Sequence, residues 1–468
     1  MKETPMTRPT LIRSSMGLLL SAALLTACGT STPTAAVPQP GAGSSAEQIV
    51  TVLNPDPALS DVQLAARHGG TLVTRTPAFA VIAAADTRPL TAQNAGLGVV
   101  RERNRGALSL PAMNRVNAGS NTIGGQGVNY WGGGVAYWGN GVAYWGGSTT
   151  LWGSGVAYWG GGVNYWGGGV NYWGGGGQNG TTVANIDTWQ SIGLDVAQTR
   201  LGANGVPGAG VTIAVLDTGV DVAHPMFTSS LTPQDTWYDF ADGDALPMDD
   251  GTFGQDASGH GTEVAGLALI VAPGAKIMPV RVLDAQGQGN VSSVVQGILW
   301  ATDHGADIIN LSLGSDEPVE AVKQAIGYAN DAGVVVVASA GNAGTEGLRY
   351  PAGHFAGSAL NLAVGSHGLA WNKSAFSQYG ALSLLAPGEE LVGPAPGGRL
   401  AAWSGTSMSA PVVAGAAALA LSSGSLNGAD AVRRIQATAT GVDALAANQP
   451  FAGKLGAGRL NLDALTRP

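Results

Sequence analysis

The chain has 468 residues, enough for roughly two to four domains. Only 11% of the residues are charged and 73 are glycine, which excludes a coiled coil or a charged disordered tail. The formal net charge is −9, and residues 183–468 carry 12 Lys and Arg against 25 Asp and Glu. Because an acidic surface repels phosphate groups, we expect no nucleic acid partner.

The first 28 residues have the pattern of an export signal. Three basic residues precede an apolar run over 16–25, which is too short to span a membrane comfortably. The run ends in Leu-Thr-Ala-Cys at Cys28, the only cysteine, and this ending resembles a bacterial lipobox, in which the cysteine becomes lipid-modified. We expect a lipoprotein-type signal peptide over 1–28, a membrane tether through Cys28, and an exported protein of the cell envelope or medium. An ordinary signal peptide with an unrelated cysteine is the alternative.

Two segments follow the signal. Residues 29–46 are rich in Ser, Thr, Pro, Gly and Ala, a composition typical of a flexible tether. Residues 47–115 have the hydrophobic spacing of a small α+β domain. In the order βαββαβ, the predicted elements cover 48–53, 58–68, 71–75, 79–84, 90–95 and 99–100.

Residues 116–182 contain no charged residue and form a repeat linker, in which seven heptads of the Gly-Val-Asn-Tyr-Trp-Gly-Gly type run from Gly127 to Gly175. Two or three glycines per heptad exclude a helix, because each costs nearly ~1 kcal/mol there. An odd period also places successive tryptophans on alternate faces of a strand. The repeat is therefore either short strands joined by turns or a disordered aromatic linker. It is either a spacer or an adhesive segment that stacks on sugars or the cell envelope.

From 183 to 468, apolar runs alternate with helical stretches, which predicts an α/β domain with a central, mostly parallel sheet flanked by helices. Strands are expected at 211–216, 277–283, 307–313 and 333–338, and helices at 291–304, 318–332, 409–421 and 429–439.

Two motifs in this domain suggest an acid–base pair. Val-Leu-Asp-Thr-Gly ends an apolar strand at Asp217, where a buried carboxylate can orient a histidine. Ser-Gly-His-Gly-Thr surrounds His260 with glycines, as expected where backbone and substrate approach a histidine closely. Histidine is the side chain best suited to take and return a proton near neutral pH. Alone, either motif also fits a structural role.

Two further motifs supply an amide and a hydroxyl. Ala-Ser-Ala-Gly-Asn follows a buried strand and ends at Asn342. Gly-Thr-Ser-Met-Ser-Ala-Pro places Ser407 at the start of a small apolar helix, whose N-terminus suits a negative charge. A turn asparagine and an N-cap serine are the ordinary explanations.

Together, in the order Asp, His, Asn, Ser, the four motifs resemble the subtilisin family over nearly all of the chain after 185. The resemblance implies a serine endopeptidase acting on polypeptides without a catalytic cofactor. Asp217, His260 and Ser407 would form the catalytic triad, and Asn342 would donate in the oxyanion hole. The α+β unit would be the propeptide of a zymogen and its intramolecular inhibitor. Glu263 departs from the family, many members of which have a second histidine there.

By the same resemblance, Ser312, Leu313 and Gly314 form an edge that pairs with the substrate backbone. Ala338, Ser339 and Ala340 form the opposite wall of the first specificity pocket, and Arg349 lies near its base. If the Arg349 side chain points inward, it favours acidic or polar substrate residues; if it points to solvent, the pocket is apolar and broad.

An acidic loop before the histidine motif suits structural calcium, which is often found in the family, although simple solvation also explains it. Its members are Asp239, Asp242, Asp244, Asp249 and Asp250. The sequence leaves the metal ligands open.

Two other functions compete with a general endopeptidase. One is an inactive scaffold of the same fold that binds peptides or the cell envelope through the aromatic repeat. The other is a maturation protease with a single natural substrate. The propeptide would be cut near the basic stretch Arg101, Arg103 and Arg105, although the bond itself cannot be identified from the sequence.

Overall fold

The computed structural model describes residues 46–84, 98–104, 106–111, 185–253 and 255–468, together with five short strands between 114 and 172. Cys28, the tether and the helix predicted over 90–95 lie outside these residues. No helix in the described part of the chain is long and apolar enough to cross a bilayer.

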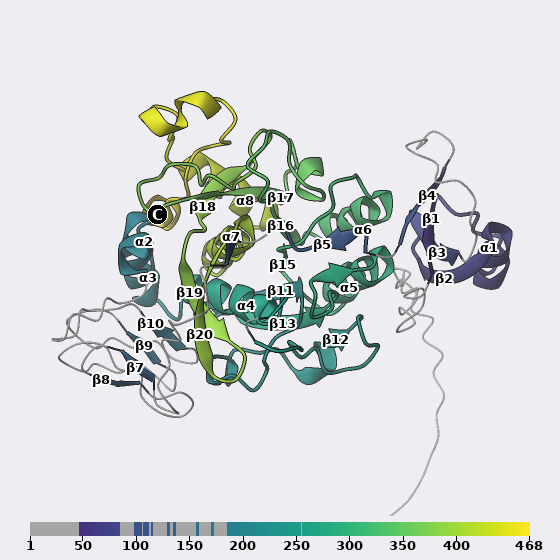
Figure 1. The fold of residues 1–468 in the computed structure, drawn as a ribbon, viewed down its shortest axis with the longest axis horizontal. Helices are drawn as coiled ribbons and strands as arrows, with labels where there is room; N and C mark the ends of the chain where they lie inside the picture. Colours follow the sequence, from purple (N-terminus) through teal and green to yellow (C-terminus); the bar gives the residue numbers. More distant parts are fainter. Residues whose placement is uncertain are drawn as a thin grey trace, which may run out of the picture. The chain divides into compact units, whose positions relative to one another are not determined.

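The N-terminal unit, drawn in purple in Figure 1, is a four-stranded antiparallel sheet with one helix. Its elements are β1 (Gln48–Leu53), α1 (Asp61–His68), β2 (Gly70–Arg75), β3 (Phe79–Ala84) and β4 (Val99–Arg103), with the strand order β2-β3-β1-β4. Helix α1 begins with a capping box between Ser60 and Gln63 and ends at Gly69, which adopts the left-handed conformation. Val50, Ile82 and Leu64 form its small core. The four strands coincide with the predicted ones.

Only short strands are described from 114 to 172. They are β6 (Asn114–Arg115), β7 (Asn129–Trp131), β8 (Gly134–Ala136), β9 (Val156–Tyr158) and β10 (Val170–Tyr172). Strands β7 and β8 pair antiparallel, whereas β9 and β10 pair parallel. These parts of the repeat therefore fit the short-strand alternative.

The C-terminal unit is built on a seven-stranded sheet in which every strand is parallel to its neighbours. In the order β12-β13-β11-β15-β16-β17-β18, the strands are Tyr238–Asp239, Lys276–Arg281, Thr212–Asp217, Ile308–Leu311, Val335–Ser339, Asn361–His367 and Leu384–Pro387. The predicted sheet is confirmed, and its parallel arrangement extends to all seven strands. Most residues of the central strands β11, β15 and β16 are Val, Ile, Leu or Ala, because both faces of the sheet are buried there.

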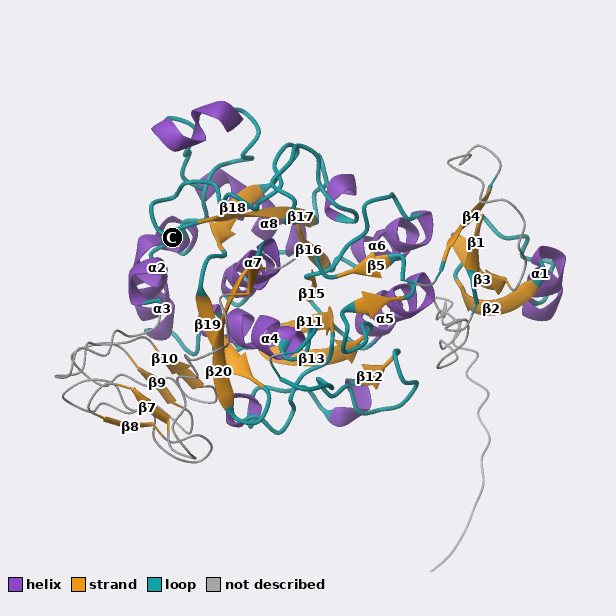
Figure 2. Cartoon of the chain, in the orientation of Figure 1, coloured by secondary structure: helices purple, strands orange, loops and turns teal. Residues whose placement is uncertain are grey.

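Helices cover both faces of this sheet (Figure 2). They are α2 (Ile186–Ser191), α3 (Leu194–Gly202), α4 (His260–Val271), α5 (Val291–Asp303), α6 (Glu320–Asp331), α7 (Thr406–Leu421), α8 (Gly428–Thr438) and α9 (Leu462–Leu465). Helices α4 and α7 pack on each other and on the face that carries Ile213 and Val215. Helix α5 covers the opposite face, where Gly297 lies against Leu216. Helix α7 can lie centrally because it is made almost wholly of small residues.

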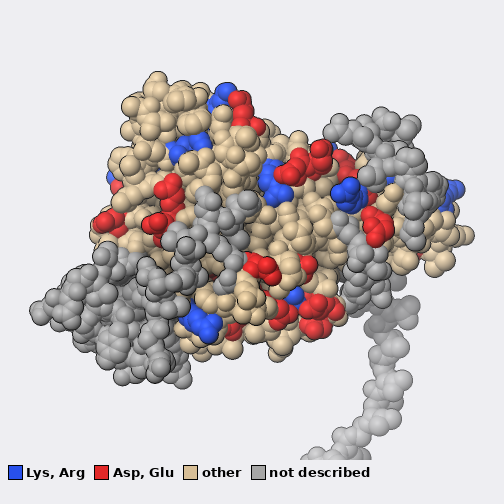
Figure 3. Space-filling view, in the orientation of Figure 1, with Lys and Arg blue, Asp and Glu red and all other residues tan. Residues whose placement is uncertain are grey.

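Two smaller pairings flank the sheet. Strand β14 (Gln288–Gly289) pairs antiparallel with β5 (Leu108–Ser109), which comes from the segment after β4. Strands β19 (Leu391–Ala395) and β20 (Arg399–Ser404) form a hairpin, and β6 adds to the edge of β20. On the face drawn in Figure 3, acidic and basic side chains are interspersed, and no continuous basic area is visible among its described residues.

Candidate active site

The candidate site lies where the order of the sheet reverses. The chain passes from β11 to β13 on one side and later returns to β15 on the other, so the carboxyl ends of β11 and β15 flank a switch point. Such ends are where open parallel sheets carry ligand groups. Asp217 is the last residue of β11, and Ser312 follows β15 directly.

Asp217 and His260 form a fully buried pair. His260 Nδ1 lies 2.7 Å from Asp217 Oδ1, and both side chains are 0% exposed. The same Asp217 oxygen accepts the N–H of Thr218 at 2.7 Å. The histidine is the first residue of α4, and its ring packs edge-on against Trp403. His260 Nε2 is buried and, within the described residues, has no hydrogen-bond partner, so that nitrogen is free to exchange a proton with a substrate or nucleophile.

Glycines bring the two segments together, as the crowding around His260 predicts. A Cβ at Gly261 would lie 2.1 Å from the carbonyl oxygen of Gly219 and 3.1 Å from Asp217 Cβ. Gly219 itself has a φ of +101°, and a Cβ there would lie 2.4 Å from Met248 O. The first turn of α4 therefore touches the backbone of the Asp217 loop directly.

Ser407 lies in the first turn of α7, and α4 and α7 are packed together. Its hydroxyl donates to Ser312 O at 3.2 Å, and Ser312 Oγ donates to Ser407 O at 2.7 Å. Ser407 is 0% exposed. Two hydrogen bonds therefore join the first turn of α7 to Ser312 after β15, and the Ser407 hydroxyl makes one of them.

Asn342 is held with its amide nitrogen free. Its Oδ1 accepts from Thr406 N at 2.9 Å and from Thr406 Oγ1 at 2.8 Å. Its Nδ2 is buried without a hydrogen-bond partner among the described residues, and the position of a Cβ at Gly405 would lie 3.0 Å from it. By binding Oδ1, Thr406 therefore fixes the orientation of the Asn342 amide and leaves Nδ2 unpaired among the described residues. Thr406 belongs to the sequence motif around Ser407, but we did not predict that it would orient Asn342.

The predicted substrate edge carries a strand of the same chain. Ser109 N donates to Gly314 O, and Gly314 N donates to Ser109 O, both at 2.9 Å. On the other side, Leu110 N donates to Gly287 O at 3.0 Å, next to the β5–β14 pairing. The segment 108–110 is therefore the middle strand between β14 and Gly314. We predicted the substrate-binding edge at Ser312–Gly314 but did not predict the second edge at 287–289. Its only signal in the sequence is Gly-Gln-Gly.

Arg349 binds this middle strand. Its guanidinium donates to Ser109 O at 3.2 Å and to Ser109 Oγ at 3.1 Å, and it pairs with Asp316 at 2.9 Å. The guanidinium thus contacts the residue that pairs with Gly314, and its place relative to the first specificity pocket stays a prediction. The remaining predicted wall residues, Ala338, Ser339 and Ala340, are buried at the end of β16.

The acidic loop surrounds an arginine. Arg281 at the end of β13 lies 2.8 Å from Asp239, 2.5 Å from Asp242 and 3.0 Å from Asp250. No cluster of three or more His, Cys, Asp or Glu side chains suited to a metal occurs in the described part of the chain. These carboxylates do not fit calcium, because a guanidinium already occupies the position between them.

Two other carboxyl groups lie at the site: Asp249, which the sequence grouped with the acidic loop, and Glu263, which it left without a role. Asp249 accepts hydrogen bonds from Thr218, Gly259 and Thr262, the neighbours of Asp217 and His260. Glu263, one turn after His260, is 0% exposed, and neither of its oxygens has a hydrogen-bond partner among the described residues. Burial raises the pKa of Glu263 well above its ordinary value, which favours the neutral carboxylic acid.

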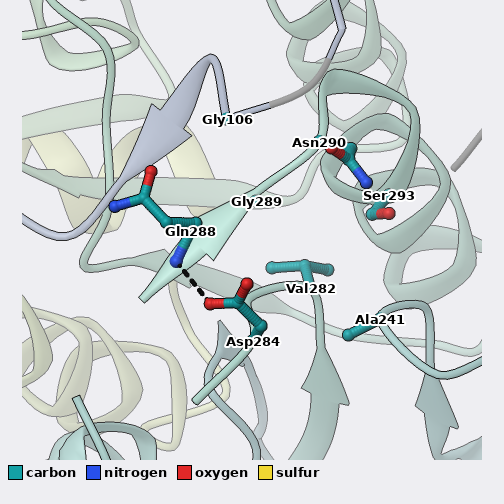
Figure 4. A pocket seen from close by; sticks show the side chains of 8 residues that line it. All are labelled: Gly106, Ala241, Val282, Asp284, Gln288, Gly289, Asn290 and Ser293. Atoms are coloured by element: carbon teal, nitrogen blue, oxygen red, sulfur yellow. Dashed lines mark hydrogen bonds between the residues drawn. The ribbon is translucent and has the colours of Figure 1, made fainter. Parts of the chain in front are cut away.

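A polar cavity of about 250 Å³ lies beside β14, away from the triad. Asp284, Gln288, Asn290 and Ser293 line it, and Gly106 borders it from the N-terminal segment (Figure 4). The Gln288 N–H donates to Asp284 Oδ1 at 2.9 Å and so holds one side of the cavity. None of the predicted site residues lines it, whereas the predicted substrate edge at Gly314 is paired with Ser109.

Comparison with known proteins agrees with this arrangement. The model of the subtilase family matches residues 208–458. An alkaline protease of Alkalihalobacillus alcalophilus is 40% identical over 250 residues, which are 51% of this chain but only 60% of that protein. Subtilisin Savinase of Lederbergia lenta is 41% identical over 225 residues, 46% of this chain and 77% of that protein. A solved cold-adapted subtilisin-like serine proteinase matches 55% of this chain and 88% of its own, with 30% identity and a TM-score of 0.46.

Proposed function

Because the chain belongs to the subtilase family, we propose that it is a serine endopeptidase that hydrolyses polypeptides through an acyl-enzyme. The observation that carries this proposal is the buried pair of Asp217 and His260, with the histidine Nε2 unpartnered within the described residues and the Ser407 helix packed beside it. A buried pair with one free ring nitrogen is the arrangement that a general base requires.

The proposed chemistry uses side chains and backbone alone and needs no cofactor. His260 Nε2 takes the proton from Ser407 Oγ as this oxygen bonds to the substrate carbonyl carbon. The C–N bond then breaks, and His260 returns the proton to the leaving amine. A water molecule, deprotonated by the same nitrogen, then bonds to the acyl carbon; the ester bond to Ser407 Oγ breaks, and His260 returns the proton to this oxygen as the acid leaves. Asp217 holds the ring tautomer and stabilises its charged form, while Asn342 Nδ2 and the Ser407 N–H donate to the developing oxyanion.

Substrates would bind as an added strand. Gly287, Gly289 and Gly314 offer backbone groups on both sides of the cleft, and the segment 108–110 already uses them. Recognition by main-chain hydrogen bonds tolerates many sequences. This supports a broad polypeptide substrate class rather than one defined by a single side chain.

We further propose that the N-terminal unit is the propeptide of a zymogen and inhibits the enzyme. Besides the strand in the cleft, two of its residues occupy helix N-termini of the C-terminal unit. Glu102 accepts from Glu320 N at 2.6 Å and Ala321 N at 3.2 Å at the start of α6. Asn104 Oδ1 accepts from Ser292 N at 3.0 Å at the start of α5. Neither helix has a side-chain cap of its own, so the N-terminal unit supplies both.

The pairings also support a position for the maturation cut. Residues 108–110 lie along β14 and Gly314, and Asn114 and Arg115 pair with Ser404 and Trp403 of β20. Ser407 follows β20 after two residues. We therefore propose that the cleaved bond is one of those between residues 111 and 114, downstream of the basic residues of β4.

Export would follow from the signal sequence, and lipidation of Cys28 would tether the uncut chain to the membrane. Because the tether lies before the proposed cut, we expect the catalytic unit in the medium and the propeptide in the membrane fraction. Finding only the full-length chain in membranes would contradict this scheme.

The function is tested with casein and a serine-specific fluorophosphonate probe, using the wild type and Ser407→Ala. We expect the wild type to digest casein and to be labelled, and the variant to do neither. If a folded and processed wild type shows neither property, the chain is an inactive scaffold, and binding by the aromatic repeat becomes the function to test.

A further inference from the structure

A second buried carboxylate lies beside the triad and plays no part in the mechanism described above. Asp249 is 7% exposed, and its two oxygens accept four hydrogen bonds. Oδ1 accepts from Gly259 N at 2.9 Å and from Thr218 Oγ1 at 3.3 Å. Oδ2 accepts from Thr262 N at 3.0 Å and from Thr262 Oγ1 at 2.6 Å.

The donors belong to both segments that carry the buried pair. Thr218 follows Asp217, while Gly259 and Thr262 stand on either side of His260. Thr218 Oγ1 also accepts the N–H of Gly261 at 3.0 Å, which closes a ring of hydrogen bonds between the two segments. One carboxylate therefore links the end of β11 to the start of α4.

Asp249 also replaces a missing cap. The N-cap residue of α4 is Gly259, which has no side chain to accept the free N–H groups of the first turn. Asp249 accepts two N–H groups at this helix start, and a negative charge is favoured there. The first residue of this turn is His260, so the cap determines where the imidazole stands.

We propose that Asp249 is a positioning residue that holds Asp217 and His260 in register, and that it must be ionised to do so. This inference rests on the proposed peptidase function. Each oxygen of Asp249 accepts from one backbone N–H, which can only donate, and from one threonine hydroxyl. The ionised carboxylate can accept all four hydrogen bonds at once, whereas a protonated one would require a threonine hydroxyl to reverse its direction.

Ionisation of Asp249 falls within the range of an activity measurement. Burial, with a smaller contribution from the charge of Asp217, raises the pKa of Asp249 from 3.8 to about 6. The titratable groups next to it are Asp217 on β11, His260 on α4 and Asp250, which pairs with Arg281. No ion pair to Asp249 occurs among the described residues. Because the pKa of Asp249 is higher in the folded than in the unfolded chain, its contribution to the free energy of unfolding is fully present below pH 3.8 and is lost as pH rises through about 6. Ionised Asp249 therefore lowers the stability of the folded chain relative to protonated Asp249.

The test is the dependence of kcat on pH for the full chain after processing. Asp249 must lose a proton to hold the pair, so we expect kcat of the wild type to fall as pH is lowered through about 6. Asp249→Asn, brought to the same processed state by a trace of wild-type enzyme, should lack this step, because its amide does not ionise. We also expect kcat to be at least tenfold lower and KM to change less than threefold. The matched control is Asp250→Asn, which should keep the wild-type profile.

Either of two results would overturn the inference. One is a wild-type kcat that does not fall between pH 7 and pH 5, which decides the matter even if Asp249→Asn does not fold. The other is a folded Asp249→Asn enzyme with the wild-type pH profile and kcat. Absence of any wild-type activity at pH 8 would instead refute the proposed peptidase function. Circular dichroism across the same pH range ensures that acid unfolding does not produce the fall in kcat.

Discussion

The catalytic centre and the strand that fills its cleft are held in different ways. Asp217, His260, Ser407 and Asn342 are each fixed by side-chain contacts with particular neighbours. The segment 108–110 is held mainly by its backbone, with Arg349 adding contacts to Ser109. Chemistry that depends on side chains leaves motifs in the sequence, whereas recognition by backbone groups leaves almost none. Under the proposed function, the same difference would let one cleft hold its own chain and later accept unrelated polypeptides.

The largest effect should come from removing the nucleophile. Ser407→Ala should lower kcat by about 10⁶, the loss known for the same change in a subtilisin. Strand β5 does not use this hydroxyl, so Ser109 should stay paired with Gly314 in the uncut variant. Casein hydrolysis measures the activity, and hydrogen exchange of the Ser109 and Gly314 amides measures the pairing. Loss of activity together with loss of amide protection would mean that the Ser407 hydroxyl also holds the segment in place.

Removing the oxyanion donor should have the next largest effect. Asn342→Ala should lower kcat by about 10²–10³, the size known for such a donor in a subtilisin, with little change in KM. The reason is that the free Nδ2 contacts charge that develops only in the transition state. Steady-state kinetics with a peptide anilide separates the two constants. A rise in KM at constant kcat would assign Asn342 to substrate binding instead.

A smaller effect is expected at the boundary between the two units. Glu102→Ala removes the cap of α6, and losing a cap costs about 1 kcal/mol, or roughly a fivefold change in affinity. Active enzyme should therefore emerge from the processed complex about fivefold sooner than in the wild type. The time course of anilide hydrolysis after processing measures this lag.

The control for that change is Asp61→Asn, which alters a half-exposed carboxylate paired with Arg75 inside the N-terminal unit. It should leave the lag unchanged. Equal shortening by both variants would mean that general destabilisation of the N-terminal unit, and not the cap, controls release.

The smallest effect concerns Glu263. Because burial raises its pKa, its stabilising contribution is complete at low pH and is lost as pH rises through the native pKa. Glu263→Gln cannot ionise, so its melting temperature should fall less than that of the wild type on the alkaline side. Calorimetry between pH 6 and 10 tests this, with the exposed Glu389→Gln as control. A parallel decline in all three proteins would show that Glu263 does not titrate in the folded state.

The sequence predicted the parallel sheet because buried strands are continuous apolar runs, and it predicted the positions of Asp217, His260, Asn342 and Ser407 because each ends such a run or begins a helix. It did not predict the link made by Asp249, since the path of the loop between β12 and α4 decides which acidic residue turns inward. For the same reason it grouped Asp249 with the carboxylates that surround Arg281. The role of segment 108–111 was hidden because its contacts are made largely by peptide groups that every sequence has.

The central claim is that this chain is a peptidase whose cleft holds its own maturation segment. Intact-mass measurement of the purified wild type and Ser407→Ala tests it most directly. We expect two polypeptides in the wild type, produced by cleavage of one peptide bond between residues 111 and 114. We expect a single uncut chain in Ser407→Ala. An uncut wild type that nevertheless digests casein, or a cut within β4, would contradict it.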